Sequence, residues 1–223
     1  MVRILRPEGP CFTYSGPLFQ GRFIERPNRF LTVVEVEGRK VTAHLHDPGR
    51  LQEFTIPGTP VLLRPHGGKT GLWLIAFQQG GEWALTDSSV HRKIAESLLG
   101  REARPEVKVG DSRFDFLVDG TVVEVKGCSL IQGDIALFPD APTERGVRHL
   151  RGLRRISEQG GRAAVLFLVL RSGARFFMAN RERDPAFSEA LRQAYDGGVE
   201  VRALGFRFDG RSVIYREEIQ VLW

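Results

Sequence analysis

The stretch "DSRFDFLVDGTVVEVKG", residues 111–127, places ionisable side chains at Asp115, Glu124 and Lys126 inside an otherwise apolar strand pattern. Its Asp119-Gly120 pair is a strong signal for a two-residue turn that joins two antiparallel strands. Counting outward from that turn puts Asp115 directly opposite Glu124. Like charges placed that way repel each other, so this hairpin requires something that compensates two carboxylates.

The alternation of side chains along a strand puts Lys126 on the same face as Glu124. The opposite face carries the apolar residues Phe114, Phe116, Val123 and Val125, which we expect in a core. Mg²⁺ binds to one or two carboxylates together with waters and phosphate oxygens. We therefore predict a Mg²⁺ or Mn²⁺ site at Asp115 and Glu124, with Lys126 assisting the hydrolysis of a phosphodiester.

Two alternatives to this interpretation stay open from the residues alone. The charges of Asp115, Glu124 and Lys126 can form a solvated cross-strand network with Arg113, without any metal. A β-bulge would shift the strand pairing, and Asp111 would then replace Asp115 as the acidic ligand.

The chain on either side of this hairpin reads as an α/β domain over residues 86–223. "TDSS" supplies capping side chains for a helix that ends at Gly100. Helical spacing also covers residues 142–161, ending at Gly160 and Gly161, and residues 184–197, the second with an Asp cap, an early Pro and a final Gly. The apolar run "AAVLFLVL" at 163–170 is typical of a strand covered on both faces. Together these elements predict a mixed sheet flanked by helices.

The preceding residues, 1–85, read as short strands separated by Gly and Pro. In "LTVVEVEGRKVTAHL", residues 31–45, alternation on both sides of "EGRK" predicts a hairpin. Several such strands indicate a small barrel or sandwich, and an OB-like barrel is one solution that periodicity alone does not select.

Composition limits the partners. The formal net charge of +5 favours a polyanion, and we expect DNA, or alternatively RNA. The two cysteines lie far apart and indicate neither a disulfide framework nor a zinc site. The sequence has neither a membrane-spanning apolar run nor, at its beginning, a secretory signal, so we expect a cytoplasmic protein. The oligomeric state stays open, a homodimer included.

The motifs "GDSRFDFL", "VEVKG", "ALFPDAPTERGVRHL" and "GRFIERPNRFLTVVEVEGRKVTAHLHDPGRL" occur in an order that resembles the sugar fermentation stimulation protein family. The C-terminal part also resembles the PD-(D/E)xK nuclease core of restriction endonucleases. The resemblance implies an OB-like N-terminal domain, a restriction-endonuclease-like C-terminal domain, DNA binding and a role in regulating sugar metabolism. It implies metal binding by Asp115 and Glu124, a catalytic Lys126, and an acidic helix residue, Glu96, as a further metal ligand.

Basic residues in both domains are candidates for nucleic-acid contacts. In the N-terminal domain Arg22, Arg26, Arg29 and Arg50 could form a charged groove, with Phe23 and Phe30 as stacking or core residues. In the predicted helix after "ALFPD", the candidates are Arg145, Arg148, His149 and Arg151. A solvated helix face would show the same charges, and His149 could equally pack inside.

Overall fold

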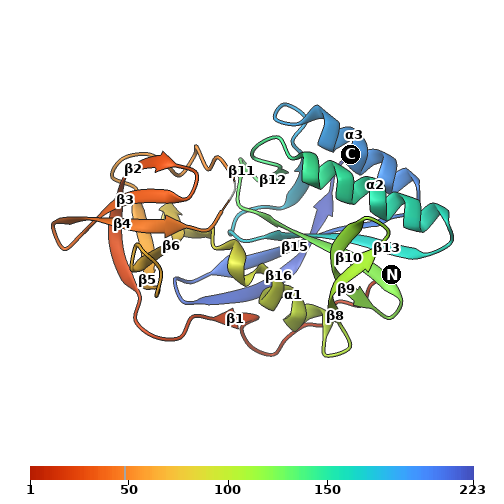
Figure 1. The fold of residues 1–223 in the computed structure, drawn as a ribbon, viewed down its shortest axis with the longest axis horizontal. Coiled ribbons are helices and arrows are strands. Elements are labelled where there is room, and N and C mark those ends of the chain that lie inside the picture. The colour runs from red at the N-terminus through yellow and green to blue at the C-terminus, as the bar shows by residue number, and fades with distance from the viewer. Residues whose placement is uncertain (48) are drawn as a thin grey trace.

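The computed structural model describes residues 1–47 and 49–223. It has two lobes joined in one continuous set of paired strands, with a barrel at the left of Figure 1 and an α/β lobe at the right. No helix in the described ranges is both long and apolar enough to cross a membrane.

The N-terminal lobe is a closed barrel of five strands. They are β2 (Phe19–Asn28), β3 (Leu31–Val36), β4 (Arg39–Leu45), β5 (Pro60–Pro65) and β6 (Leu72–Gln79). Pairing runs β2–β3–β4–β6–β5 and returns to β2, with β4 and β6 parallel and the other pairs antiparallel. Phe23, Val34, Leu63 and Phe77 fill the interior. The predicted OB-like barrel is confirmed, and so is the hairpin, whose turn is Glu37-Gly38.

The C-terminal lobe is a mixed sheet. Its strands, in spatial order, are β8 (Arg104–Val109), β9 (Ser112–Val118), β10 (Thr121–Cys128), β13 (Arg162–Val169), β15 (Glu200–Phe208), β16 (Ser212–Val221), β14 (Phe176–Ala179), β12 (Ile135–Phe138) and β11 (Ile131–Gln132). The central β10, β13 and β15 are parallel. β13 is buried along nearly its whole length, as the unbroken apolar run predicted.

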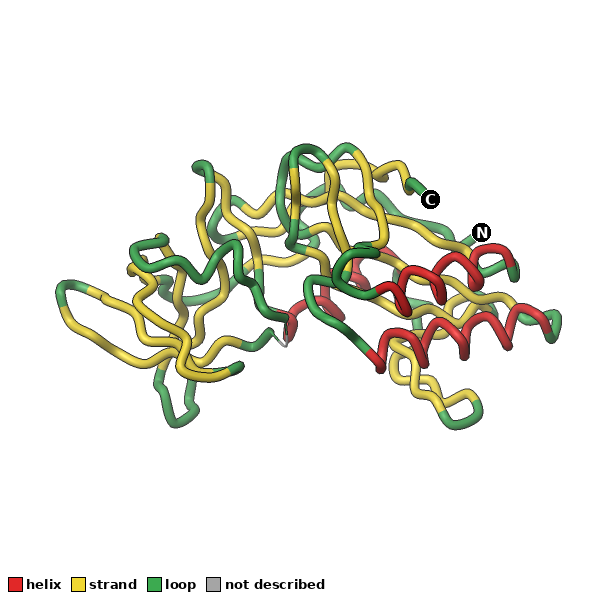
Figure 2. Tube along the Cα trace, turned by 90° about the horizontal axis from the view of Figure 1, so that it is seen from above, coloured by secondary structure: helices red, strands yellow, loops and turns green. Residues whose placement is uncertain are grey.

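Helices cover both faces of this sheet. A short 3-10 turn, Ser88–Val90, leads into α1 (His91–Leu99), which packs with β9, β10 and β13 on one face. On the other face α2 (Glu144–Glu158) and α3 (Pro185–Asp196) lie side by side (Figure 2). The predicted caps form: Asp87 and Asp184 each accept a hydrogen bond from a backbone N–H of the turn they begin. Thr143 caps α2 in the same way, a cap that was not predicted from the sequence.

Two segments connect the lobes. β1 (Phe12–Thr13) pairs with β16, so the first residues of the chain lie against the C-terminal lobe although they precede the barrel in sequence. β7 (Glu82–Leu85) pairs with both β6 of the barrel and β15 of the sheet. The division into residues 1–85 and 86–223 stays a prediction, and β7 lies at its boundary.

Candidate metal and nucleic-acid site

The β9–β10 hairpin forms with the predicted turn and register. Asp119-Gly120 is the turn, with φ angles of 47° and 73°, and pairing extends to Val123 opposite Phe116. Just beyond this pair, the Oδ2 atom of Asp115 accepts a hydrogen bond from the backbone N–H of Val125 at 2.7 Å. The carboxylate of Asp115 therefore lies beside the strand that carries Glu124 and Lys126.

The neighbouring strand β8 is distorted at the position that would pair with Asp115. Pro105 pairs with Phe116 and Val107 pairs with Phe114, while Glu106 between them has a φ of 56°. This left-handed conformation is uncommon for a residue other than glycine and marks a local irregularity of the sheet. Around Asp115 the side-chain alternation of β9 is broken, since Phe114 packs toward α2 and Phe116 toward α1, against the single apolar face that alternation predicted. The Val125 hydrogen bond still places Asp115, and not the rival Asp111 in the β8–β9 turn, beside the strand that carries Glu124.

Glu124 is the most deeply buried charged residue of the site, at 2% exposure. Its Oε1 atom accepts hydrogen bonds from Lys126 Nζ and from His149 Nδ1 of α2. Burial acts to raise the pKa of Glu124, but the hydrogen bond from His149 and the charge of Lys126 outweigh it, so the pKa is lowered. Glu124 is therefore held as a carboxylate.

The second oxygen of Glu124, Oε2, is buried and has no hydrogen-bond partner among the described residues. Burial of Asp115 and the nearby charge of Glu124 together raise the pKa of Asp115, although the Val125 hydrogen bond and Lys126 oppose that shift. Asp115 and Glu124 thus place two negative charges close together, and both depend on the same nearby positive charge of Lys126. A cation between them would stabilise both ionised forms.

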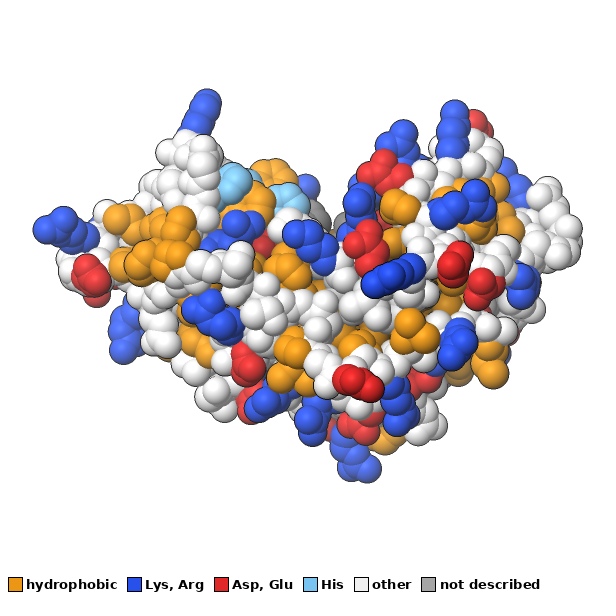
Figure 3. Space-filling view, turned by 90° about the horizontal axis from the view of Figure 1, so that it is seen from below, with side chains coloured by type: hydrophobic (Ala, Val, Ile, Leu, Met, Phe, Trp, Pro, Cys, Tyr) orange, Lys and Arg blue, Asp and Glu red, His pale blue; other side chains and the backbone are white. Residues whose placement is uncertain are grey.

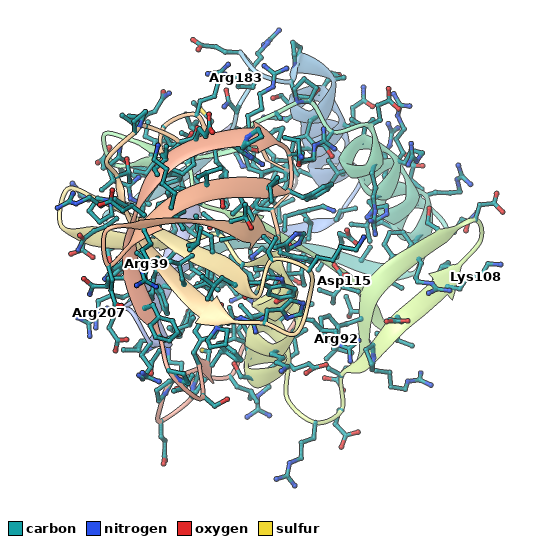
Figure 4. All side chains as sticks on the ribbon, turned by 60° about the vertical axis from the view of Figure 1, so that its left-hand side comes forward. Arg39, Arg92, Lys108, Asp115, Arg183 and Arg207 are labelled. Atoms are coloured by element: carbon teal, nitrogen blue, oxygen red, sulfur yellow. The ribbon has the colours of Figure 1, made fainter. Side chains whose placement is uncertain are left out.

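These groups line a cleft of about 660 Å³ between the lobes. Its walls come from the barrel side (Arg29, Asp47, Gly49, Leu51), from the start of α1 (Ser88, His91, Arg92), from β9 and β10 (Asp115, Glu124, Lys126) and from the segment that leads into α2 (Asp140, Thr143, Arg145). Figure 3 shows the notch between the lobes with basic side chains on both sides, and Figure 4 shows Asp115 and Arg92 on its wall.

The cleft holds few acidic ligands close together. Within residues 1–47 and 49–223, no three His, Cys, Asp or Glu side chains are grouped so that they could hold a metal ion. A cation at Asp115 and Glu124 would take its other ligands from water and from a bound phosphate. That is the coordination pattern which Mg²⁺ prefers.

The structure brings some of the predicted nucleic-acid residues into the cleft and assigns others elsewhere. Arg29 and Arg145 line it. The guanidinium of Arg26 instead donates to the backbone carbonyls of Arg29, Asp47, Gly49 and Arg50. Arg26 thus stabilises the loop at the barrel edge, a role that its charge in the sequence does not reveal.

The remaining candidates lie outside the cleft lining. Arg22 and Arg50 are exposed on the barrel, and Arg148 and Arg151 on α2. Glu96 on α1 forms an ion pair with Arg92, 3.1 Å between Oε1 and Nε, and its side chain is 39% exposed. His149 is buried against Glu124 and Phe114, so the packing alternative describes it better than a phosphate contact.

Sequence reasoning missed His91, which lies beneath β10. A Cβ atom on Gly127 would overlap the His91 imidazole, so only glycine fits beside Lys126 here. Burial lowers the pKa of His91 to about 4 and keeps the ring neutral.

Sequence reasoning also missed that Asp140 links the lobes. The Oδ2 atom of Asp140 accepts a hydrogen bond from the backbone N–H of Leu51 at 3.1 Å. The only sequence signal for the His91 contact is Gly127, the glycine directly after Lys126. No local signal predicts the hydrogen bond between Asp140 and Leu51.

Two sequence profiles match the chain. Residues 82–212 match the "Sugar fermentation stimulation protein RE domain", and residues 24–86 match the "SfsA N-terminal OB domain". The chain is 44% identical over 211 residues to a sugar fermentation stimulation protein homolog of Sulfolobus acidocaldarius, covering 94% of this chain and 92% of the relative. A homolog of Methanothermobacter thermautotrophicus is 45% identical over 199 residues, or 82% and 83% of the two chains.

A solved structure is similar over nearly the whole length. It is that of the SfsA protein of Pyrococcus furiosus in complex with Ca²⁺, with a TM-score of 0.88 and 33% identity. The match covers 96% of this chain and 100% of that one. Barrel and mixed sheet therefore recur together in the two proteins.

Proposed function

This chain belongs to the sugar fermentation stimulation protein family, and we propose that it binds DNA in the cleft between its lobes and hydrolyses phosphodiester bonds there with the help of Mg²⁺ or Mn²⁺. The observation that carries the proposal is Glu124, a buried carboxylate with one oxygen unpartnered among the described residues, adjacent to Asp115 and Lys126.

The residues present fit a hard divalent cation. Asp115 and Glu124 offer oxygen donors, and burial together with the charge of Glu124 raises the pKa of Asp115, a cost that a bound cation would offset. When bound, the metal would polarise the phosphate and lower the pKa of a coordinated water. The related protein of Pyrococcus furiosus was solved with Ca²⁺, a cation that also prefers oxygen ligands, which supports a cation site in this fold.

The chain's own residues then have separate tasks. The backbone N–H of Val125 fixes the carboxylate of Asp115, and His149 fixes that of Glu124. Lys126, which lines the cleft and contacts Glu124 through Nζ, would hold the attacking water or stabilise the negative charge that develops on the phosphate. Water attacks phosphorus as one of its protons passes to solvent, the P–O bond to the leaving group breaks, and the leaving oxygen takes up a proton from solvent.

Cleavage of end-labelled DNA tests this proposal. We expect cutting of single-stranded or double-stranded DNA with Mg²⁺ or Mn²⁺ and none with a chelator. Loss of cutting in the chelator must be reversed by adding the metal back. Equal cutting with and without metal would point to a contaminating enzyme or to a different mechanism.

Binding of DNA should also depend steeply on salt. Neutralising each phosphate releases counterions, so contacts from Arg29, Arg92, Lys126 and Arg145 in the cleft predict a fall in affinity of about 50- to 150-fold between 50 and 200 mM salt. Fluorescence anisotropy in the presence of a chelator measures this without cleavage. An affinity that does not change with salt would contradict binding through phosphates.

One observation favours a second function. Lys126 and His149 already contact Glu124 and can compensate its charge without a metal. The protein would then be a DNA-binding regulator of sugar metabolism genes that keeps a silent nuclease fold. Salt-dependent binding combined with no cleavage under any metal condition would favour this alternative.

A further inference from the structure

A row of side chains crosses the outside of the barrel next to the cleft. Strand pairing aligns His44 of β4 with Trp73 of β6, and Trp73 with Arg64 of β5. Residues paired across neighbouring strands point to the same face of a sheet. The alternate positions, Ala43, Leu45, Leu63 and Leu74, are buried in the barrel interior, so the row faces outward.

The rings of this row are stacked around Trp73. His66 lies 4.1 Å from it between ring centroids, with 29° between the planes, and His46 lies at 5.3 Å and 24°. The guanidinium carbon of Arg64 is 4.2 Å from the Trp73 centroid. We call Phe30, His44, His46, Arg64, His66 and Trp73 the stacking platform.

The platform is held in place and open to solvent. Buried Asp87 lies 3.7 Å from Nε of Arg64 and so orients the guanidinium over Trp73. Phe30 stacks on His44 at 6.1 Å and 18°, yet its side chain is 47% exposed. Phe30 and His46 are exposed, and His44, His66 and Trp73 are half-buried, so their rings form a contiguous surface of the kind that marks an interaction site.

The platform also reaches the rim of the cleft. Nδ1 of His46 is 2.9 Å from Oγ of Ser88, and Ser88 lines the cleft. At the other end, Phe30 follows Arg29, which is a second lining residue. In Figure 3 the histidine side chains lie on the barrel lobe beside the notch.

We propose that the stacking platform binds unpaired nucleobases, and that the protein takes single-stranded nucleic acid as its ligand and leads that strand into the cleft. Delivery of the strand to a cleaving site rests on the proposed function, whereas binding of the strand by the platform does not depend on cleavage. Flat rings and a guanidinium stack on any base, and Arg64 adds attraction to the backbone. Bases inside a duplex have no free face for such stacking.

The test compares three probes of equal length in a chelator, where no cleavage occurs: a labelled single strand, the same strand with abasic sites, and a blunt duplex. We expect wild type to bind the single strand at least about tenfold more tightly than the abasic strand. Trp73→Leu, His66→Ala and Phe30→Ala should each weaken binding of the single strand, and Trp73→Leu by about tenfold or more. The same variants should leave binding of the abasic strand unchanged. An RNA strand serves as a parallel arm.

Tyr195→Ala is the matched control, because Tyr195 is also an exposed aromatic residue, at 46%, but lies on α3. If Trp73→Leu fails to fold, the variants of the half-buried His66 and the exposed Phe30 still test the platform. A second measurement uses Trp83→Phe with Trp223→Phe, which leaves Trp73 as the one tryptophan of the sequence. Its fluorescence should then be quenched by the single strand and not by the abasic strand.

Equal binding of the three probes, or variants that bind the single strand like wild type, would overturn the platform. Either result is compatible with metal-dependent cleavage and so leaves the proposed reaction standing. Conversely, base-dependent binding without any cleavage would support the stacking platform and refute the proposed nuclease activity.

Discussion

Glu124→Gln is expected to lower the rate of metal-dependent DNA cleavage by about a hundredfold to a thousandfold, the loss that removal of several kcal/mol of transition-state stabilisation causes. Glutamine has nearly the same shape, but it removes the charge that His149 and Lys126 stabilise and one of two anionic ligands for the metal. DNA binding in a chelator should change little. Single-turnover cleavage and anisotropy measure the two effects.

Two comparison variants make this result specific. Glu158→Gln removes an exposed carboxylate of α2 that pairs only with Arg154 among the described residues, and it should cut like wild type. Glu96→Gln tests the metal role that the family resemblance implies for α1. Glu96 does not line the cleft and is paired with Arg92, so we expect full activity. Full cleavage by Glu124→Gln would show that the hairpin carboxylates are not the site.

The part of the site that sequence predicted is the part that local rules determine. Asp119-Gly120 sets a two-residue turn, and the turn sets the register as far as Phe116 opposite Val123. Asp115 is the next residue along β9, and its carboxylate therefore reaches the β10 segment that carries Glu124. The caps of the helices followed in the same way, since Asp87 and Asp184 act on their own first turns.

The rest of the site depends on contacts between distant segments. His149 reaches Glu124 only because α2 packs across β9 and β13, and His91 lies beneath Gly127 only because α1 covers the opposite face. Similarly, Phe23 and Phe30 are equivalent aromatic residues in the sequence, yet the barrel buries the first at 2% exposure and leaves the second at 47%. The difference in exposure between Phe23 and Phe30 comes from closure of the barrel and not from their hydrophobicity, which is the same.

The contact between the lobes is also nonlocal. The link from Asp140 to Leu51 and the strand β7 shared by both sheets join residues far apart in sequence. They place the stacking platform beside the cleft, and no pattern within either domain could specify that placement. Function at this cleft therefore depends on the two domains being fixed together.

Asp115→Asn is expected to lower the rate of cleavage to the same extent as Glu124→Gln while making the metal-free protein more stable. Burial and the charge of Glu124 raise the pKa of Asp115 in the folded state. A carboxyl group whose pKa is higher in the folded state than in the unfolded state destabilises the fold when it is ionised. This destabilisation grows as the pH rises above the pKa of the group in the unfolded chain. Asparagine keeps an oxygen for the Val125 N–H and removes the charge, so the repulsion across the strands disappears.

The expected gain is about 0.2–1 kcal/mol, or roughly 1–4 °C in Tm, at neutral pH and in a chelator. It should shrink as the pH is lowered through the raised pKa of Asp115, because the wild-type carboxyl is then neutral as well. Adding Mg²⁺ should raise the Tm of wild type and not that of the variant, because only wild type binds the metal with two carboxylates. A variant less stable than wild type in chelator would mean that Lys126 and His149 already compensate both charges, and the argument for a cation at this hairpin would fail.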